Sequence, residues 1–400
     1  MNRRSFLASL LGAAPVALLA QAKSLKLKIT GLKTFVVNTG SLNWVFCKVY
    51  TDAGLVGLGE GSVTSKELTV AAAIQEHERF LVGKDPADIE LLWQGMYRNP
   101  RWRGGPILNS AISAVEIALW DILGQALGVP IYKLLGGAAR TRIRMYLDVG
   151  GTPEAYLQAK EQGFTAAKCT LPAPINGVMQ PSASVRDAVK RLTAIRKAVG
   201  DDFDIAVDAH GRCTTTMAVD FCRRVEDLAL LFVEEVTQLE DIGELAHVRE
   251  KTKTPLATGE RAFTKYAFAD FCSRHLVDYV QPDVCHAGGI LEMKKIGILA
   301  ETYRIEMAPH NPQSYVSTMA SLHVDATTPA STIQEYAQNR TPWVQDLFDG
   351  LGPTIKAGYA ELPTRPGLGV TLNEKIAAEH PYKPATRGAF RFDDGAVADQ

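Results

Sequence analysis

The stretch DIAVDAHGR, residues 204–212, decides how this chain folds. An apolar run typical of a buried strand, residues 205–207, ends at Asp208, and His210 follows after one residue. A single ionisable group at the end of a strand is unremarkable, because strand ends reach solvent, so the pattern is informative only if it recurs. If Asp208 and His210 belong to a shared site, the same arrangement should appear at the ends of other strands.

Polar or ionisable residues do end a series of strand-like runs beyond residue 140. The runs end at Tyr146, Lys168, Asp208, Glu234, Glu260, Asp283, His310 and Glu335, and from Asp208 onward the spacing is 23 to 27 residues. Amphipathic helical patterns separate the runs, but no regular helix directly follows the eighth. Eight units of this size predict an α/β fold with a closed (β/α) barrel of the TIM type, which we assign to residues 141–345.

The chain before the barrel has a different pattern. Residues 24–50 alternate apolar and polar side chains, and TDAGLVGLGEG, residues 51–61, is typical of a hairpin. Residues 65–138 are mostly helical in pattern, with a helix stop at Gly128-Val129-Pro130. We therefore predict an α+β capping domain over residues 23–140. Residues 346–400 are expected to form a C-terminal segment that returns to the cap.

The first 22 residues resemble an export signal. MNRRSFLASLLGAAPVALLAQA has two arginines, a short apolar run and a small-x-small ending. The apolar run is too short to span a membrane well, and NRRSFL resembles the twin-arginine signal that exports folded proteins. We expect the mature chain to begin near Lys23 and to work in the periplasm, without a membrane anchor once the signal is cleaved.

Composition excludes some classes of partner. The 400 residues carry a formal net charge of −1, which provides no basic surface for nucleic acid. The six cysteines form no CxxC pair, so they predict neither a zinc site nor a disulfide framework. An anionic small-molecule substrate is not excluded, because one positive cleft can lie in a neutral protein. Barrels of this kind often form symmetric assemblies, so we also expect a homo-oligomer.

The ends of the predicted barrel strands carry the chemistry. In such barrels the C-terminal ends of all strands meet at one mouth. Burying that many charges together is unfavourable unless they are compensated. Asp208, Glu234 and Glu260 offer three carboxylates from adjacent strands, and oxygen ligands of this kind suit Mg²⁺. The sequence therefore predicts a Mg²⁺ site with these three ligands.

Several motifs together resemble the enolase superfamily, and within it the acid-sugar dehydratases of the D-galactonate and D-mannonate dehydratase type. The motifs are RWRGGPILNSAISAVEIALWD from residue 101, VDAHGR from 207, VEE from 233, TGER from 258, QPDVCHAGGI from 281, APHNP from 308 and PGLGV from 366. The resemblance implies a cap closed over the barrel mouth. It also implies a reaction that begins by removing the proton next to a carboxylate, with a Lys or His base and Mg²⁺.

The resemblance also implies roles for single residues. His310 is the candidate base, and Asp283 would hold its ring in one tautomer. His210 is the candidate acid that protonates a leaving hydroxyl; its two-residue offset from Asp208 would place both on one side of an extended segment. Lys168 would place a cation beside the substrate carboxylate. Relatives that racemise often have a second lysine where this chain has Thr170, which argues against a two-base racemase.

Other residues receive less specific predictions. Glu335 resembles a glutamate that binds substrate oxygen, and Trp102 and Arg103 are candidates to reach the substrate from a cap loop. Arg101 lies in the same loop, and for all three residues a solvated basic turn is an equal alternative. Three further residues of the motifs are expected to support the site rather than to react: Glu235, Arg261 and His286.

Two departures from the resemblance concern the substrate end of the site. Val236 stands where relatives usually have proline, and the residues after His310 differ from those of typical dehydratases. The cap loop over residues 38–46 also varies among relatives and is expected to touch the tail of the substrate.

The expected activity is Mg²⁺-dependent dehydration of a sugar acid, for example galactonate, mannonate or gluconate. His310 takes the C2 proton, His210 assists loss of the C3 hydroxyl, and a 2-keto-3-deoxy sugar acid results. One alternative is another superfamily reaction, a cycloisomerase or epimerase on a carboxylate or lactone, which needs only His310. A second is a periplasmic sugar-acid binding protein that has the pocket without turnover.

Overall fold

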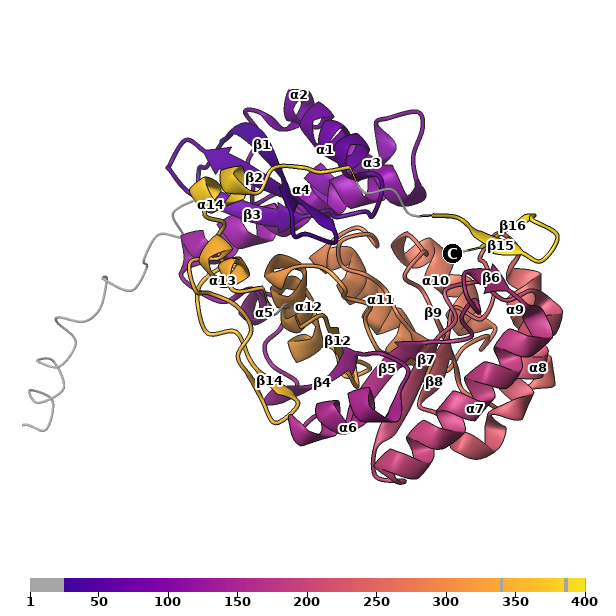
Figure 1. The fold of residues 1–400 in the computed structure, drawn as a ribbon. Helices are drawn as coiled ribbons and strands as arrows, with labels where there is room; N and C mark the ends of the chain where they lie inside the picture. The colour runs from indigo at the N-terminus through magenta and orange to yellow at the C-terminus, as the bar shows by residue number, and fades with distance from the viewer. Residues whose placement is uncertain (1–24, 339–340, 385–387, 400) are drawn as a thin grey trace, which may run out of the picture.

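The structure, a computed structural model, describes residues 25–338, 341–384 and 388–399 (Figure 1). The predicted export signal, residues 1–22, lies outside the described residues. The signal and the periplasmic location therefore stay predictions.

A closed barrel of parallel strands forms the larger part of the molecule. Its strands, in spatial and chain order, are β4 (Arg142–Asp148), β5 (Ala166–Thr170), β7 (Asp204–Asp208), β8 (Phe232–Glu234), β9 (Leu256–Thr258), β10 (Tyr279–Val280), β11 (Glu306–Met307) and β12 (Gln334–Tyr336). β12 pairs in parallel with β4, and Met307 bridges Ser331 just before β12, so the sheet closes on itself. The (β/α) barrel predicted from the strand spacing is confirmed.

Helices follow the strands around the outside of the barrel (Figure 1). They are α6 (Pro153–Glu161), α7 (Pro181–Val199), α8 (Thr215–Arg224), α9 (Ile242–Lys251), α10 (Thr264–Ser273), α11 (Ile290–Tyr303) and α12 (Tyr315–Thr327). β12 is followed only by the short helix α13 (Trp343–Leu347), in agreement with the missing helical pattern there.

Small and aromatic side chains fill the barrel interior below the mouth. Tyr146 and Phe232 pack there edge to face, with ring centroids 6.2 Å apart, among alanines from several strands. Because residues two apart on a strand share a face, the inward-facing positions beyond this apolar layer point into the mouth. The polar side chains at the strand ends are placed in this way.

The cap lies over the barrel mouth (Figure 1). It consists of an antiparallel sheet, β1 (Ile29–Asn38), β2 (Asn43–Thr51) and β3 (Val56–Glu60), and of helices α1 (Glu67–Glu76), α2 (Glu78–Leu81), α3 (Ile89–Arg98) and α4 (Gly105–Leu127). The short helix α5 (Ile131–Leu134) leads to the barrel. α4 is long and apolar enough to cross a membrane by length and composition, but 83% of that apolar window is buried inside the molecule. α4 is the central packing helix of the cap.

Glycines let α4 lie directly on β3 and the residue after it. A β-carbon at Gly57, Gly59 or Gly61 would come within 2.0, 1.9 or 2.5 Å of a carbonyl oxygen of α4. Those carbonyls belong to Ala118, Ala114 and Ser110, which are spaced one helical turn apart. The alternate glycines of the hairpin motif therefore allow the backbone of α4 to pack closely against the strand.

Two buried cap carboxylates dock the cap on the barrel. Glu116 of α4 accepts hydrogen bonds from the backbone N–H groups of Ile290 and Leu291, at the start of α11. Glu60 of β3 accepts hydrogen bonds from the Ser314 hydroxyl and the Ser317 backbone N–H, at the start of α12. The first N–H groups of a helix lack partners within the helix and favour an anion.

The C-terminal segment contacts both parts of the molecule. β14 (Tyr359–Glu361) pairs with β4 and with β13 (Ile355–Lys356), on the barrel. α14 (Glu374–Glu379) returns to the cap, where Glu374 forms ion pairs with Lys33 and Lys48. β15 (Phe390–Phe392) then pairs with β6 (Val178–Met179) and β16 (Val397–Ala398) at the barrel rim.

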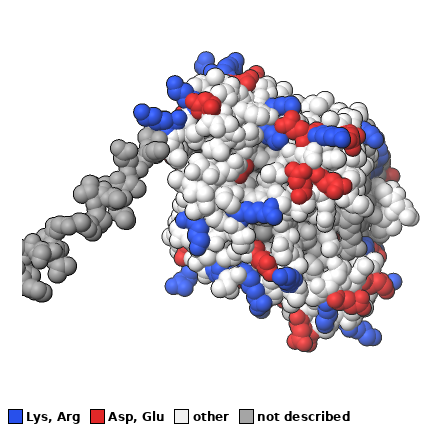
Figure 2. Space-filling view, turned by 90° about the vertical axis from the view of Figure 1, so that its left-hand side faces the viewer, with Lys and Arg blue, Asp and Glu red and all other residues white. Residues whose placement is uncertain are grey.

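Charges of both signs are interspersed over the face of the molecule seen in Figure 2, rather than gathered by sign. This distribution agrees with the near-zero net charge of the sequence.

Candidate active site

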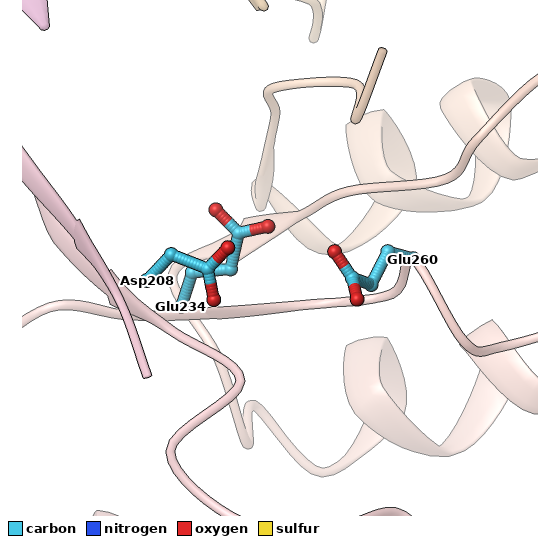
Figure 3. A group of neighbouring side chains, drawn as sticks. All are labelled: Asp208, Glu234 and Glu260. Atoms are coloured by element: carbon cyan, nitrogen blue, oxygen red, sulfur yellow. The ribbon is translucent and has the colours of Figure 1, made fainter. Parts of the chain in front are cut away.

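Three carboxylates meet at the mouth of the barrel (Figure 3). Asp208 and Glu234 end β7 and β8, and Glu260 lies two residues beyond β9. Each offers a ligand oxygen, and these oxygens lie within 4.8 Å of one another. Burial and the charge of Asp208 hold the pKa of Glu234 well above its usual range, and Glu234 Oε1 is buried without a hydrogen-bond partner among the described residues. These are the conditions that a divalent cation relieves.

Lys168 of β5 partly neutralises the cluster from below. Its Nζ lies 2.8 Å from Glu234 and 2.9 Å from Glu335, with Asp208 at 3.6 Å. Burial alone would lower the pKa of Lys168, but the surrounding carboxylates outweigh this and hold it well above its usual range. Lys168 therefore stays charged at the floor of the site.

His310 and Asp283 form a hydrogen-bonded pair. His310 lies three residues after β11, and its Nδ1 donates to Asp283 Oδ2 at 2.8 Å. Its Nε2 then faces Glu260 Oε2 at 3.0 Å. Burial opposes protonation of His310, but Glu260 and Asp283 outweigh it and raise the pKa of His310 well above its usual range. The pairing leaves Nε2 as the atom that takes or releases a proton at the carboxylate cluster.

His210 reaches the same cluster from β7, but by a tight turn. Its φ is +51°, in the left-handed region, and its backbone N–H donates to Asp208 Oδ1 at 2.7 Å. The ring Nε2 lies 3.1 Å from Asp208 Oδ2. The extended segment expected after Asp208 is therefore wrong, because β7 ends at Asp208 and the chain turns back on its carboxylate. Burial lowers the pKa of His210, although Asp208 and Glu260 oppose this.

Glu335 of β12 is engaged by the protein. Its Oε1 pairs with Lys168 at 2.9 Å, and its Oε2 accepts a hydrogen bond from the Asn311 backbone N–H at 2.8 Å. It still lines the cavity above the cluster, so the predicted contact with substrate oxygen stays a prediction.

A cavity of about 490 Å³ lies between the carboxylates and the cap. The cap contributes Leu42, Asn43 and Trp44, from the loop expected to touch the substrate tail. The barrel contributes the cluster, both histidines and Lys168. The cavity is large enough for a six-carbon acid and is lined by polar groups on the barrel side.

Trp102 and Arg103 are not brought to this cavity. They line a separate cavity of about 300 Å³ within the cap, between α1, α3 and the start of α4. Trp102 is 81% exposed, and the Arg103 guanidinium lies 5.5 Å from the centre of the Tyr97 ring. The structure therefore separates these two candidate substrate-binding residues from the carboxylate cluster, because the loop that carries them lines a cavity with α1, α3 and the start of α4 instead.

The supporting residues of the motifs contact the site from its sides. Arg261 pairs with Glu260 at 3.2 Å and with Glu235 at 3.5 Å. His286 lies 3.6 Å from Asp283, and its Nδ1 is 2.8 Å from the hydroxyl of Ser110 on α4. His286 therefore joins the cap to the carboxylate that holds His310.

Two charged residues line the cavity although the sequence predicted no function for them. Asp148 ends β4, two residues beyond the strand end read from the sequence at Tyr146. Because residues two apart on a strand share a face, the sequence could have predicted that Asp148 points the same way as Tyr146. Arg212 belongs to the quoted motif, and its guanidinium lies 5.2 Å from the ring centre of Phe390 in the C-terminal segment. That contact has no local sequence signal.

Comparison with known proteins agrees with this geometry. Residues 23–136 match the N-terminal domain of the mandelate racemase / muconate lactonizing enzyme family, and residues 153–376 match the enolase C-terminal domain-like family. A curated D-galactonate dehydratase of Verminephrobacter eiseniae is 38% identical over 387 residues, which cover 93% of this chain and all of that protein.

Solved structures are similar over the same extent. An enolase of Pantoea ananatis with bound D-gluconate and Mg has a TM-score of 0.87 at 30% identity, covering 94% of this chain and all of the other. The 3,6-anhydro-D-galactonate cycloisomerase of Zobellia galactanivorans has a TM-score of 0.81 at 29% identity, covering 89% of this chain and all of the other. With both domains matched and relatives aligned over nearly the whole length, the chain belongs to the enolase superfamily, in the mandelate racemase / muconate lactonizing enzyme family.

Proposed function

We propose that this protein removes water from a six-carbon sugar acid of the galactonate or gluconate kind and releases a 2-keto-3-deoxy acid. By family and by its curated relatives the chain is an acid-sugar dehydratase, a hydro-lyase; the substrate and the product are the proposal. The observation that carries it is the approach of two histidines to one carboxylate cluster. His310 comes from the end of β11 and His210 from the end of β7.

Mg²⁺ fits the three carboxylates, since they offer only oxygen ligands. Two of these oxygens, Glu234 Oε1 and Glu260 Oε2, are buried without a hydrogen-bond partner among the described residues. The similar enolase of Pantoea ananatis is described with Mg and D-gluconate bound. When bound, Mg²⁺ would stabilise the negative charge that develops on the substrate carboxylate as the C2 proton leaves. The cation would also compensate the charge of Glu260, which is the main cause of the raised pKa of His310.

His310 acts as the base at C2. Asp283 accepts the hydrogen bond from Nδ1, so the lone pair of the neutral ring lies on Nε2, which faces the cluster. Nε2 takes the C2 proton, and the electron pair of the C–H bond passes into the carboxylate-conjugated system. Lys168 stays charged at the floor of the site and adds positive potential where that charge accumulates.

His210 acts as the acid at C3. The electron pair returns to form the C2–C3 double bond, the C3–O bond breaks, and His210 gives a proton to the departing hydroxide, which leaves as water. Burial lowers the pKa of His210 and so makes its protonated form a stronger acid. The enol that remains takes a proton at C3, releases the proton of its C2 hydroxyl to solvent, and becomes the 2-keto-3-deoxy acid.

The experiment is a dehydration screen of the mature chain with Mg²⁺ over stereoisomeric aldonates and aldarates, with detection of 2-keto acid. His310→Asn and His210→Asn are expected to lower kcat by about 10²–10⁴-fold, the usual contribution of a positioned acid or base. His247→Asn, an exposed histidine on α9, is the matched control and should retain activity. Full turnover in the His310 variant would refute the assignment.

A cycloisomerase or epimerase is the second candidate. It is supported by the similarity to the cycloisomerase of Zobellia galactanivorans, and it would need only proton removal by His310. Solvent deuterium that enters C2 without loss of water would favour this reaction. Release of water in step with C2 exchange would exclude it.

A further inference from the structure

Asp148 is a charged residue of the cavity to which the proposed reaction assigns no task. It is the last residue of β4, two positions after Tyr146, whose side chain packs inside the barrel. Because positions two apart share a face of a strand, Asp148 points toward the mouth. Its side chain is exposed to the cavity of about 490 Å³. Asp148 therefore faces the ligand space rather than the barrel core.

The protein leaves the Asp148 carboxylate without a partner. Among the described residues 25–338, 341–384 and 388–399, its side chain makes no hydrogen bond or ion pair within the usual distances. Lys168, its register partner on β5, is engaged by Glu234, Glu335 and Asp208 instead. The surrounding walls raise the pKa of Asp148 to about 6, with further contributions from Glu335 and Asp208. Asp148 is therefore mainly ionised at neutral pH.

A substrate in the proposed pose reaches this carboxylate. Its own carboxylate and C2 would lie at the metal cluster, Lys168 and His310. Asp148 is the register partner of Lys168 and lines the same cavity as His310. The remaining carbons must occupy the space between the end of β4 and the cap residues Asn43 and Trp44. A carboxylate accepts hydrogen bonds but cannot donate them when ionised, so it suits hydroxyl groups.

We propose that Asp148 selects polyhydroxy monocarboxylates over dicarboxylates: it accepts hydrogen bonds from tail hydroxyls and repels a second carboxylate. This inference rests on the proposed function and names its substrate class, aldonates rather than aldarates. Specificity of this kind comes as much from repulsion of the wrong ligand as from contacts with the right one. The competing arrangement is a second carboxylate held by Arg212, which also lines the cavity.

The test uses ligand pairs that differ only at C6, namely D-gluconate against D-glucarate and D-galactonate against galactarate. Dissociation constants are measured with Mg²⁺ in His310→Asn, so that binding is read without turnover, and then in the same protein carrying Asp148→Asn. The expected result is an aldonate preference that falls by about tenfold or more when the charge is removed, through tighter binding of the aldarate. Asp187→Asn, on the exposed surface of α7, should leave the preference unchanged.

Three outcomes would overturn the inference. The first is tighter binding of the aldarate than of the aldonate when Asp148 is present. The second is a ratio of dissociation constants that Asp148→Asn leaves unchanged. The third is no binding of any of the four acids. Turnover is measured separately in the chain with and without Asp148→Asn. If the protein dehydrates a sugar acid but its ratio of aldonate to aldarate affinity is the same with and without Asp148→Asn, this inference is wrong and the proposed function stands. If binding selectivity depends on Asp148 but no ligand yields a 2-keto acid, the proposed function is wrong. The pocket is then a selective binding site for aldonates.

Discussion

Glu234 is the residue of the site that depends most on its counter-charges. It is fully buried, Lys168 lies 2.8 Å from one oxygen, and the other oxygen has no hydrogen-bond partner among the described residues. Its repulsion with Asp208 is relieved only in part by Lys168. A cation that binds the folded protein but not the unfolded chain must therefore stabilise the fold.

We expect Mg²⁺ to raise the Tm of the protein and Glu234→Gln to abolish most of that shift. The variant loses one anionic ligand, so Mg²⁺ affinity should fall by about 10²-fold or more. Thermal denaturation across a Mg²⁺ titration measures this without reference to activity. Glu250→Gln, on the exposed face of α9, should keep the full shift. An equal shift in both variants would mean that the cation binds elsewhere.

Asp283 acts on the reaction through His310. It is fully buried, and its pKa is held below its usual range because His286 and His310 outweigh the effect of burial. Asp283→Asn keeps the shape but removes the charge that fixes the His310 tautomer. We expect kcat and C2 deuterium exchange to fall together by about 10²-fold or more, as when a carboxylate that orients a catalytic histidine is neutralised.

The Mg²⁺-dependent Tm shift should survive in Asp283→Asn, because this residue is not among the three candidate ligands. Asp202→Asn, at an exposed position before β7, serves as the control for the substitution. Unchanged C2 exchange would show that His310 does not need its partner.

At the scale of elements, the contact between α4 and β3 sets the position of the cap. A β-carbon at Gly59 would lie 1.9 Å from the Ala114 carbonyl oxygen, and a backbone atom cannot turn aside as a side chain can. We expect Gly59→Ala to destabilise the protein by about 3 kcal/mol or more, the upper range for overpacking. Urea denaturation gives the free energy of unfolding.

Gly31→Ala on β1 is the matched control for Gly59→Ala. Its new β-carbon would meet only the end of the Glu78 side chain, at 3.2 Å. We expect a change of about 1 kcal/mol or less, since overpacking is costly mainly where the neighbours cannot move. Equal losses of unfolding free energy in the two variants would contradict the close packing of α4 on β3.

At the scale of the whole molecule, His323 of α12 joins three segments. Its Nδ1 accepts a hydrogen bond from the Tyr132 backbone N–H of α5 at 3.2 Å, and its Nε2 donates to the Leu368 carbonyl of the C-terminal segment at 3.2 Å. The ring must be neutral to make both bonds. Burial accordingly lowers the pKa of His323 to about 4.

This histidine predicts acid sensitivity. The unfolded chain has a histidine pKa near 6.5, so it binds a proton before the folded protein does. Stability from His323 is complete above about pH 6.5 and is lost as the pH falls toward 4, by about 3 kcal/mol in all. His323→Gln should lack this part of the pH dependence.

The difference in unfolding free energy between the unchanged protein and His323→Gln gives the contribution of His323, because the other groups titrate equally in both. His77, whose pKa burial also lowers to about 4, acts in the same direction, whereas buried Glu60, with a pKa raised to about 7, acts in the opposite one. Denaturant unfolding from pH 4 to 8 is the measurement. Parallel stability curves for the protein and its His323 variant would contradict the prediction.

The sequence by itself determined the barrel and the residues that meet at its mouth. Strand ends such as Asp208, Glu234 and His310 recur at a regular interval, and a closed parallel barrel brings all of them together whatever the loops do. This is why the carboxylate cluster could be predicted from the sequence, whereas the pairing of His310 with Asp283 followed from the resemblance to the family.

Only the tertiary structure decided how the cap and the C-terminal segment complete the cavity. Nothing in the local pattern around Trp102 shows that its loop lines a separate cavity within the cap, and nothing around Phe390 shows that it packs on Arg212. The turn at His210 also became visible only in the fold. Periodicity encodes which face of an element is buried, whereas the docking of one domain on another depends on contacts between residues far apart in the chain.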